Sequence, residues 1–93
     1  MINKITIEKI EKYKKISERA LKQASKNINP KRKKEAGIIL DMAKRYINDA
    51  EYFQKKEDLV DCFAALNYAH GWIDTGSRLG IFNVTDNKIF IVK

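Results

Sequence analysis

Three stretches of this sequence carry apolar residues at steps of three and four, and this helical spacing is the strongest constraint on the fold. Each stretch has about 22 to 26 residues, or roughly 33–39 Å of helix. The connections between them are only two or three residues long, and such short connections force consecutive helices to be antiparallel neighbours. The sequence therefore predicts an all-α, up-down-up three-helix bundle over residues 1–82.

Helix boundary signals agree with this spacing. The first helix is expected over about residues 6–27, with an apolar stripe that includes Ile7 and Ile10. Asn29 and Pro30 are a strong start signal for the second helix, and Asp58 is the expected N-cap of the third. The apolar arc of the third helix consists of residues with small side chains, Cys62, Ala65, Ala69, Gly76 and Gly80. Because small side chains let neighbouring backbones approach closely, we expect this helix to be the most buried.

The last eleven residues, 83–93, do not follow the helical pattern and form a predicted C-terminal extension. Asp86 and Asn87 are a turn signal between Val84 and the apolar run 89–92, which suggests an extended or hairpin tail. An isolated two-stranded hairpin is marginally stable in water. The tail must therefore pack on the bundle, pair with another chain, or be loose.

Composition excludes several classes of protein. The longest run without a formal charge is residues 62–73, which is too short to span a bilayer. The N-terminus lacks the apolar stretch of a signal peptide. The absence of any possible internal disulfide fits a reducing cytoplasm, which is the expected location. The single cysteine, Cys62, permits no internal disulfide and is expected to be a buried, inert thiol. One cysteine and one histidine cannot make a Cys/His zinc site, and we expect no metal and no cofactor.

The net charge of +7 is concentrated in the first third of the chain. Residues 1–34 carry 12 Lys and Arg against 3 Glu, whereas residues 35–93 carry 7 against 9 acidic residues. Four of these cations stand in the expected first turn of the second helix, where the helix dipole disfavours positive charge. The bundle would bring further cations to the same end. This basic pole, a candidate site for phosphate or nucleic-acid backbones, comprises Lys22, Lys26, Lys31, Arg32, Lys33, Lys34 and Arg78. A solvated, lysine-rich surface is the alternative interpretation.

A polar stripe on the third helix is the second candidate site. Asn67, Gly71, Asp74 and Arg78 share one face at 100° per residue, with His70 at its edge. An imidazole four residues from a carboxylate could perform acid–base chemistry, but the pair offers only two metal ligands. A helix-surface ion pair explains it without any function. Gly71 costs helix stability on a polar face, so it suggests that another backbone or a ligand approaches closely here. We interpret it as a dimer contact, and the expected contact residues are Asn67, His70, Gly71 and Asp74.

The second half of the chain resembles a known family. The residues that carry the resemblance are Tyr52-Phe53, Asp58, the run from Phe63 to Asp74, and Arg78 to Phe82. They are similar to an archaeal family of small helical proteins catalogued as a domain of unknown function, number three hundred and fifty-seven. In that family glycine is common where Glu57 stands here. The resemblance implies a three-helix bundle in archaeal cytoplasm, and it implies no activity.

Three hypotheses about function follow from the sequence. The first is a non-catalytic, self-associating interaction module, based on Gly71 and on the apolar tail. The alternative is a nucleic-acid accessory protein that uses the basic pole. The third is an enzyme that uses His70 and Asp74. A second copy of the chain and nucleic acid are the expected partners, with no membrane and no small-molecule substrate.

Overall fold

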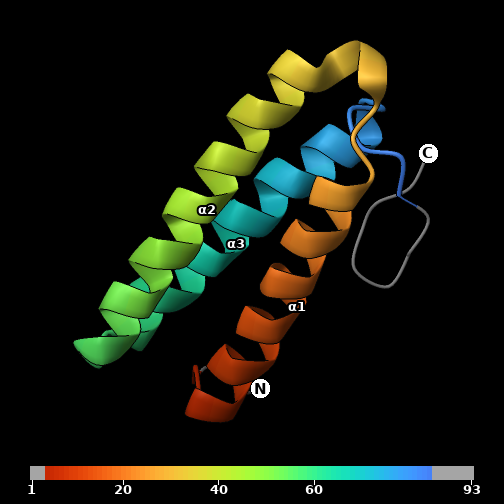
Figure 1. The fold of residues 1–93 in the computed structure, drawn as a ribbon. Helices are drawn as coiled ribbons and strands as arrows, with labels where there is room; N and C mark the ends of the chain where they lie inside the picture. The colour runs from red at the N-terminus through yellow and green to blue at the C-terminus, as the bar shows by residue number, and fades with distance from the viewer. Residues whose placement is uncertain (1–3, 85–93) are drawn as a thin grey trace.

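A computed structural model, which describes residues 4–84, contains three helices in up-down-up order (Figure 1). They are α1 (Ile7–Lys26), α2 (Lys33–Lys55) and α3 (Leu59–Arg78), and a short 3₁₀ turn, η1 (Pro30–Arg32), precedes α2. The predicted three-helix bundle is thus confirmed. Within the described residues, no helix is long and apolar enough to cross a bilayer. The predicted turn at Asp86 and Asn87 and the run 89–92 lie outside these residues.

The predicted helix starts carry side-chain caps. The Asp58 carboxylate accepts a hydrogen bond from the Asp61 backbone N–H at 3.0 Å, which confirms Asp58 as the N-cap of α3. Asn29 also caps as predicted, because its Oδ1 accepts from the Lys31 N–H at 3.0 Å. Its cap serves η1, however, and α2 itself begins three residues later than the sequence suggested, at Lys33.

Both long helices of the α2–α3 pair end in the same backbone motif. After α3, the Ile81 N–H donates to the Gly76 carbonyl at 2.8 Å and Gly80 adopts a φ of 77°. This is a Schellman cap, which needs a left-handed residue. Gly80 therefore ends the helix and does not continue its apolar arc, contrary to the sequence-based expectation. After α2 the Asp58 N–H donates to the Phe53 carbonyl, and the left-handed position is filled by a non-glycine residue, Glu57, with a φ of 59°.

The core lies between all three helices, and α2 and α3 pack against each other most extensively. As expected, α3 has more buried positions than α1 or α2, and Cys62 is among them. The stripe predicted for α1 is wrong at its first residue, since Ile7 is 62% exposed. The covered face of α1 begins at Ile10 and includes the polar Ser17, so it is rotated slightly from the apolar stripe.

Residues after α3 return to the connection between α1 and α2. The Asn29 N–H donates to the Ile81 carbonyl at 2.9 Å, and the Asn83 N–H donates to the Asn27 carbonyl at 2.7 Å. Phe82 follows into the core and lies against Gly76. The chain therefore stays attached to the bundle through residue 83. The end of α1, the start of α2 and the end of α3 meet at one pole of the bundle (Figure 1).

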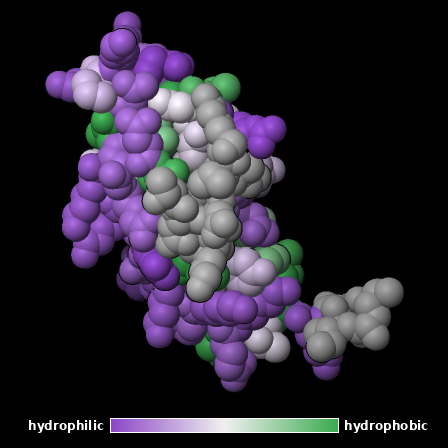
Figure 2. Space-filling model, turned by 90° about the vertical axis from the view of Figure 1, so that its right-hand side faces the viewer, coloured by the Kyte–Doolittle hydropathy of each residue, from purple (hydrophilic) through white to green (hydrophobic). Residues whose placement is uncertain are grey.

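The side of the bundle on which α1 lies is mainly hydrophilic outside the grey atoms, as Figure 2 shows. Every exposed position of α1 from Glu8 to Lys22 is charged. Such a surface is what a solvated helix face looks like, because charged side chains remain in water. The exposed face of α3 differs from this charged face of α1, and that difference points to the candidate site.

Candidate interaction surface

The exposed face of α3 carries no charge along its central turns. Between Cys62 and Ser77 the exposed residues, called here the outer α3 face, are Ala64, Asn67, Tyr68, Gly71 and Thr75. In a chain in which 33% of residues are charged, this face is exceptional. Loss of charge together with an exposed aromatic side chain is typical of a protein–protein contact.

Tyr68 is the prominent side chain of this face. It is 61% exposed, and its ring stacks on that of Tyr46 from α2, with centroids 5.2 Å apart and an interplanar angle of 21°. The stack fixes the orientation of Tyr68 before any partner binds, which lowers the entropy cost of using it as an anchor. Next to it lies a shallow hollow of about 360 Å³, lined by Asn67, Tyr68, Gly71, Trp72 and Thr75.

Gly71 leaves open space at the centre of the face. Among residues 4–84, a Cβ atom built on Gly71 would meet nothing within 4 Å, so packing between these residues does not require glycine here. Glycine in a helix interior costs about 1 kcal/mol relative to alanine. Thr75 donates its hydroxyl to the Gly71 carbonyl at 2.8 Å, which satisfies the hydroxyl within the helix. The backbone at Gly71 is therefore open to the surface, between the exposed side chains of Asn67, Tyr68 and Thr75.

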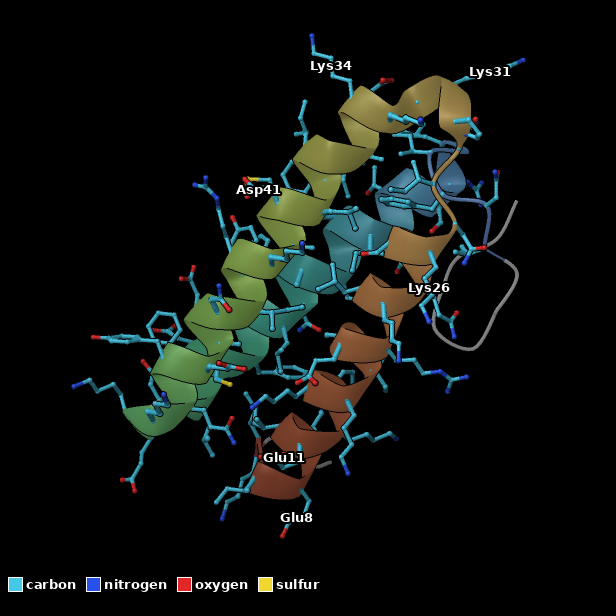
Figure 3. The ribbon with its side chains drawn as sticks, in the orientation of Figure 1. Glu8, Glu11, Lys26, Lys31, Lys34 and Asp41 are labelled. Carbon is cyan, nitrogen blue, oxygen red and sulfur yellow. The ribbon has the colours of Figure 1, made fainter. Side chains whose placement is uncertain are left out.

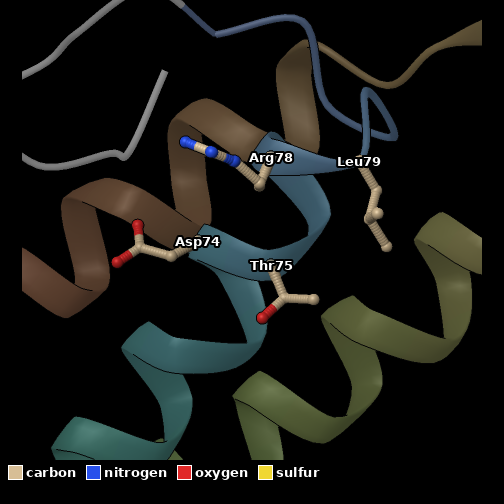
Figure 4. A pocket seen from close by; sticks show the side chains of 4 residues that line it. All are labelled: Asp74, Thr75, Arg78 and Leu79. Carbon is tan, nitrogen blue, oxygen red and sulfur yellow. The ribbon is translucent and has the colours of Figure 1, made fainter. Parts of the chain in front are cut away.

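His70 and Asp74 lie beside the outer α3 face and are mostly covered. The His70 Nε2 lies 3.3 Å from the Asp74 Oδ2, and the two side chains are 26% and 17% exposed. Asp74 and Arg78 extend to the same side of α3, while Thr75 and Leu79 extend to another (Figure 4). Among residues 4–84, no three His, Cys, Asp or Glu side chains gather as metal ligands would. Of the four predicted contact residues, Asn67 and Gly71 are thus the exposed ones.

The basic pole forms where the three helix ends meet. Figure 3 shows Lys31 and Lys34 extending outward in different directions from the turn, with Lys26 lower on α1. Arg32 is partly covered, with 38% of its side chain exposed: its Nε lies 2.7 Å from the Glu35 Oε2, and its Nη1 donates to the Leu79 carbonyl at 3.5 Å. The hydrogen bond from Arg32 lowers the pKa of Glu35. Arg32 therefore stabilises the junction between α2 and α3. The exposed cations of the pole are Lys22, Lys26, Lys31, Lys33, Lys34 and Arg78.

The family of the chain is decided by a match over most of its length. Residues 12–82 match the family described as "Protein of unknown function (DUF357)". The chain belongs to this family. No curated protein and no solved structure matches it. The DUF357 match extends the resemblance from the second half of the chain into α1. It ends at Phe82, which pairs with Ile28 in the connection between α1 and α2.

Two members of the outer α3 face in this DUF357 protein were not among the predicted contacts. The Tyr68 ring stacks on Tyr46 where α2 and α3 meet, yet most of Tyr68 is exposed. Ala64 carried no prediction. The signal that could have found both is a second series of three- and four-residue steps on α3, running through Ala64, Tyr68, Gly71 and Thr75.

Proposed function

We propose that this DUF357 protein is a non-catalytic interaction module that associates with a second copy of itself through the outer α3 face. The observation that carries the proposal is Gly71, which is exposed at the centre of an uncharged helix face and has open space around it. A helix residue that weakens the monomer and contacts none of the residues that the structure describes around it is explained by close approach of a second backbone.

The composition of the face supports the same proposal. Tyrosine is favoured at protein interfaces, and charged residues are depleted from their centres. Tyr68 supplies a fixed aromatic anchor, and Ala64, Gly71 and Thr75 allow a partner to come near the α3 backbone. His70 and Asp74 form an ion pair beside this face, and among residues 4–84 no third His, Cys, Asp or Glu joins them as a metal ligand would.

Sedimentation velocity over a range of concentrations tests the proposal. We expect a monomer–dimer equilibrium that Gly71→Lys shifts strongly to monomer, because a lysine side chain would hold the second backbone away. Gly37→Lys is the matched control, since Gly37 is also exposed, helical and without neighbours within 4 Å of a built Cβ. A wild-type chain that stays monomeric at its highest soluble concentration would refute the proposal. A variant lacking residues 85–93 tests whether the tail holds the copies together instead.

A second candidate function is binding of nucleic-acid backbones at the basic pole. It is supported by Lys31, Lys33 and Lys34, which are exposed together in η1 and the first turn of α2. It ranks second because Arg32 is engaged by Glu35 and the Leu79 carbonyl. Filter binding of duplex DNA at low and moderate salt tests it. The double variant Lys31→Glu and Lys33→Glu should abolish binding and its salt dependence, and absence of wild-type binding at low salt would end the idea.

A further inference from the structure

The exposed side of α3 repeats a pattern used by helices that pair with other helices. Six exposed residues follow one another at steps of three, four, three, four and three, which is the heptad spacing of a coiled coil. They lie opposite the core arc of the same helix, which already packs against α1 and α2. This outer heptad stripe consists of Asp61, Ala64, Tyr68, Gly71, Thr75 and Arg78.

We infer that two copies of this chain pair α3 against α3 in antiparallel orientation, about a two-fold axis between Tyr68 and Gly71. The inference rests on the proposed self-association and specifies its geometry. In this register Tyr68 faces the partner's Gly71, so the largest side chain of the stripe meets the residue that has none. Ala64 faces the partner's Thr75, and small residues therefore meet at the next layer. A two-fold axis repeats each contact, which makes the stripe complementary to itself.

The ends of the stripe are complementary in charge. Asp61 faces the partner's Arg78 in the same register, and both are exposed. Asp61 is near a second acid, Asp58, whose hydrogen bond and negative charge raise the pKa of Asp61. A guanidinium from a partner would offset this repulsion. Just outside the ion pair, Val60 faces the partner's Leu79, and these are two of the large exposed hydrophobic residues of the chain, at 67% and 54%.

A parallel pair lacks each of these advantages. It would place Asp61 beside the partner's Asp61 and Tyr68 beside the partner's Tyr68. It would also bring the two basic poles to the same end, where their cations would repel each other. The antiparallel pair puts the poles at opposite ends of a molecule whose longest dimension is 41 Å, well beyond the screening length of about 8–10 Å.

The size of the stripe limits the strength of the pairing. From Asp61 to Arg78 the stripe is about 26 Å long, and with a helix diameter of about 10–12 Å it covers roughly 300 Å² in projection. A standard interface buries about 800 Å² per partner, and smaller ones belong to weak or transient complexes. We therefore expect a dimer that forms and dissociates with concentration and is absent at high dilution.

Charge reversal tests the register. Asp61→Arg places two arginines opposite each other at both ends of the dimer, and Arg78→Asp places two aspartates there. Each variant alone should dimerise roughly tenfold more weakly than the wild type. Mixed one to one, the two variants restore both ion pairs and should form a heterodimer with an affinity close to that of the wild type. Circular dichroism of each variant confirms that the helices are retained.

The outcomes separate this inference from the proposed function. A monomeric wild type overturns both. A wild type that dimerises while both variants dimerise equally well, with no preference in the mixture, overturns the antiparallel register and leaves self-association in place. Recovery of affinity in the mixture supports the register, because a general effect on folding would weaken both variants and their mixture alike.

Disulfide cross-linking gives a second measurement that does not depend on charge. Ala64→Cys mixed with Thr75→Cys should cross-link under mild oxidation, whereas each variant alone should not, since its two new thiols would stand about 16 Å apart along the helix. Cross-linking of each variant with itself, and none in the mixture, would show a parallel pair and overturn the inference. The native Cys62 is buried and does not compete.

Discussion

Two glycines of α3, five residues apart, should respond in opposite ways to the same substitution. Gly76 stands where the Phe82 ring enters the core: a Cβ atom at Gly76 would lie 2.5 Å and 2.7 Å from two carbons of that ring and 3.1 Å from the Ile39 Cδ1. Real side chains do not approach so closely, so Phe82 must move in Gly76→Ala. At Gly71 a Cβ atom meets nothing within 4 Å.

The magnitudes follow from these distances. Both substitutions gain about 1 kcal/mol of helix propensity. Gly71→Ala keeps this gain, because the new methyl group meets only solvent. Gly76→Ala also overfills the core, which typically costs about 1–3 kcal/mol. If Phe82 leaves its site altogether, the loss approaches the roughly 3–5 kcal/mol of a large-to-small change at a buried phenylalanine. The propensity terms cancel in the comparison, so Gly76→Ala should be less stable than Gly71→Ala by about 1–5 kcal/mol.

Urea denaturation followed by circular dichroism measures this difference, at a concentration low enough to keep the chain monomeric. Thermal denaturation of the same variants gives a second reading, in which a destabilisation of 1 kcal/mol lowers Tm by about 4–8 °C for a domain of this size. Gly37→Ala on α2 is the control for the propensity term and should match Gly71→Ala. If Gly76→Ala were as stable as Gly71→Ala, the argument that the Phe82 ring leaves no room for a side chain at Gly76 would be refuted.

Three further predictions concern the turn, the pole and the thiol. Glu57→Gly should stabilise the fold by roughly 1 kcal/mol, because Glu57 holds a left-handed φ of 59° that favours glycine; thermal denaturation against Lys56→Gly as a control measures it. The pKa of Glu35 is lowered by Arg32, so their pairing should stabilise the fold above the ordinary glutamate pKa and be lost as the pH falls below it; Glu35→Gln should flatten that part of the stability–pH curve. Burial raises the pKa of the Cys62 thiol, so alkylation at neutral pH should be slow in the native chain and fast in urea.

Local signals in the sequence were sufficient for much of the fold. Asn29 and Asp58 cap their helices because a short side chain at this position places its oxygen within reach of a free backbone N–H of the first turn. The approximate helix lengths follow from apolar spacing. The rotation of α1 does not, because Ile7 lies on the apolar stripe and yet is exposed, while Ser17 is buried. Which side of a helix is covered depends on where its neighbours lie, and a single helix sequence does not contain that information.

For the candidate sites too, the sequence showed local properties of a helix and missed contacts between helices. The sequence identified Gly71 as exposed and unusual, and the open space around it agrees. It grouped Arg32 with the exposed lysines, although Arg32 bonds to Glu35 and to the carbonyl of Leu79, which lies 47 residues away. Contacts across such separations depend on the assembled bundle. Tyr68 stacks on Tyr46 at the α2–α3 junction, and only the assembled pair of helices shows that its outer side remains exposed.

The hydrogen bonds that join Asn29 to the end of α3 also bear on the order in which this chain can fold. The Asn29 side chain and backbone N–H donate to the carbonyls of Gly80 and Ile81, about fifty residues later. During synthesis, α1 and α2 emerge from the ribosome first, but the acceptors for their connecting turn do not yet exist. The α2–α3 hairpin closes a short loop, and short loops close first. The corner between the first two helices is therefore completed last, by the residues translated after α3.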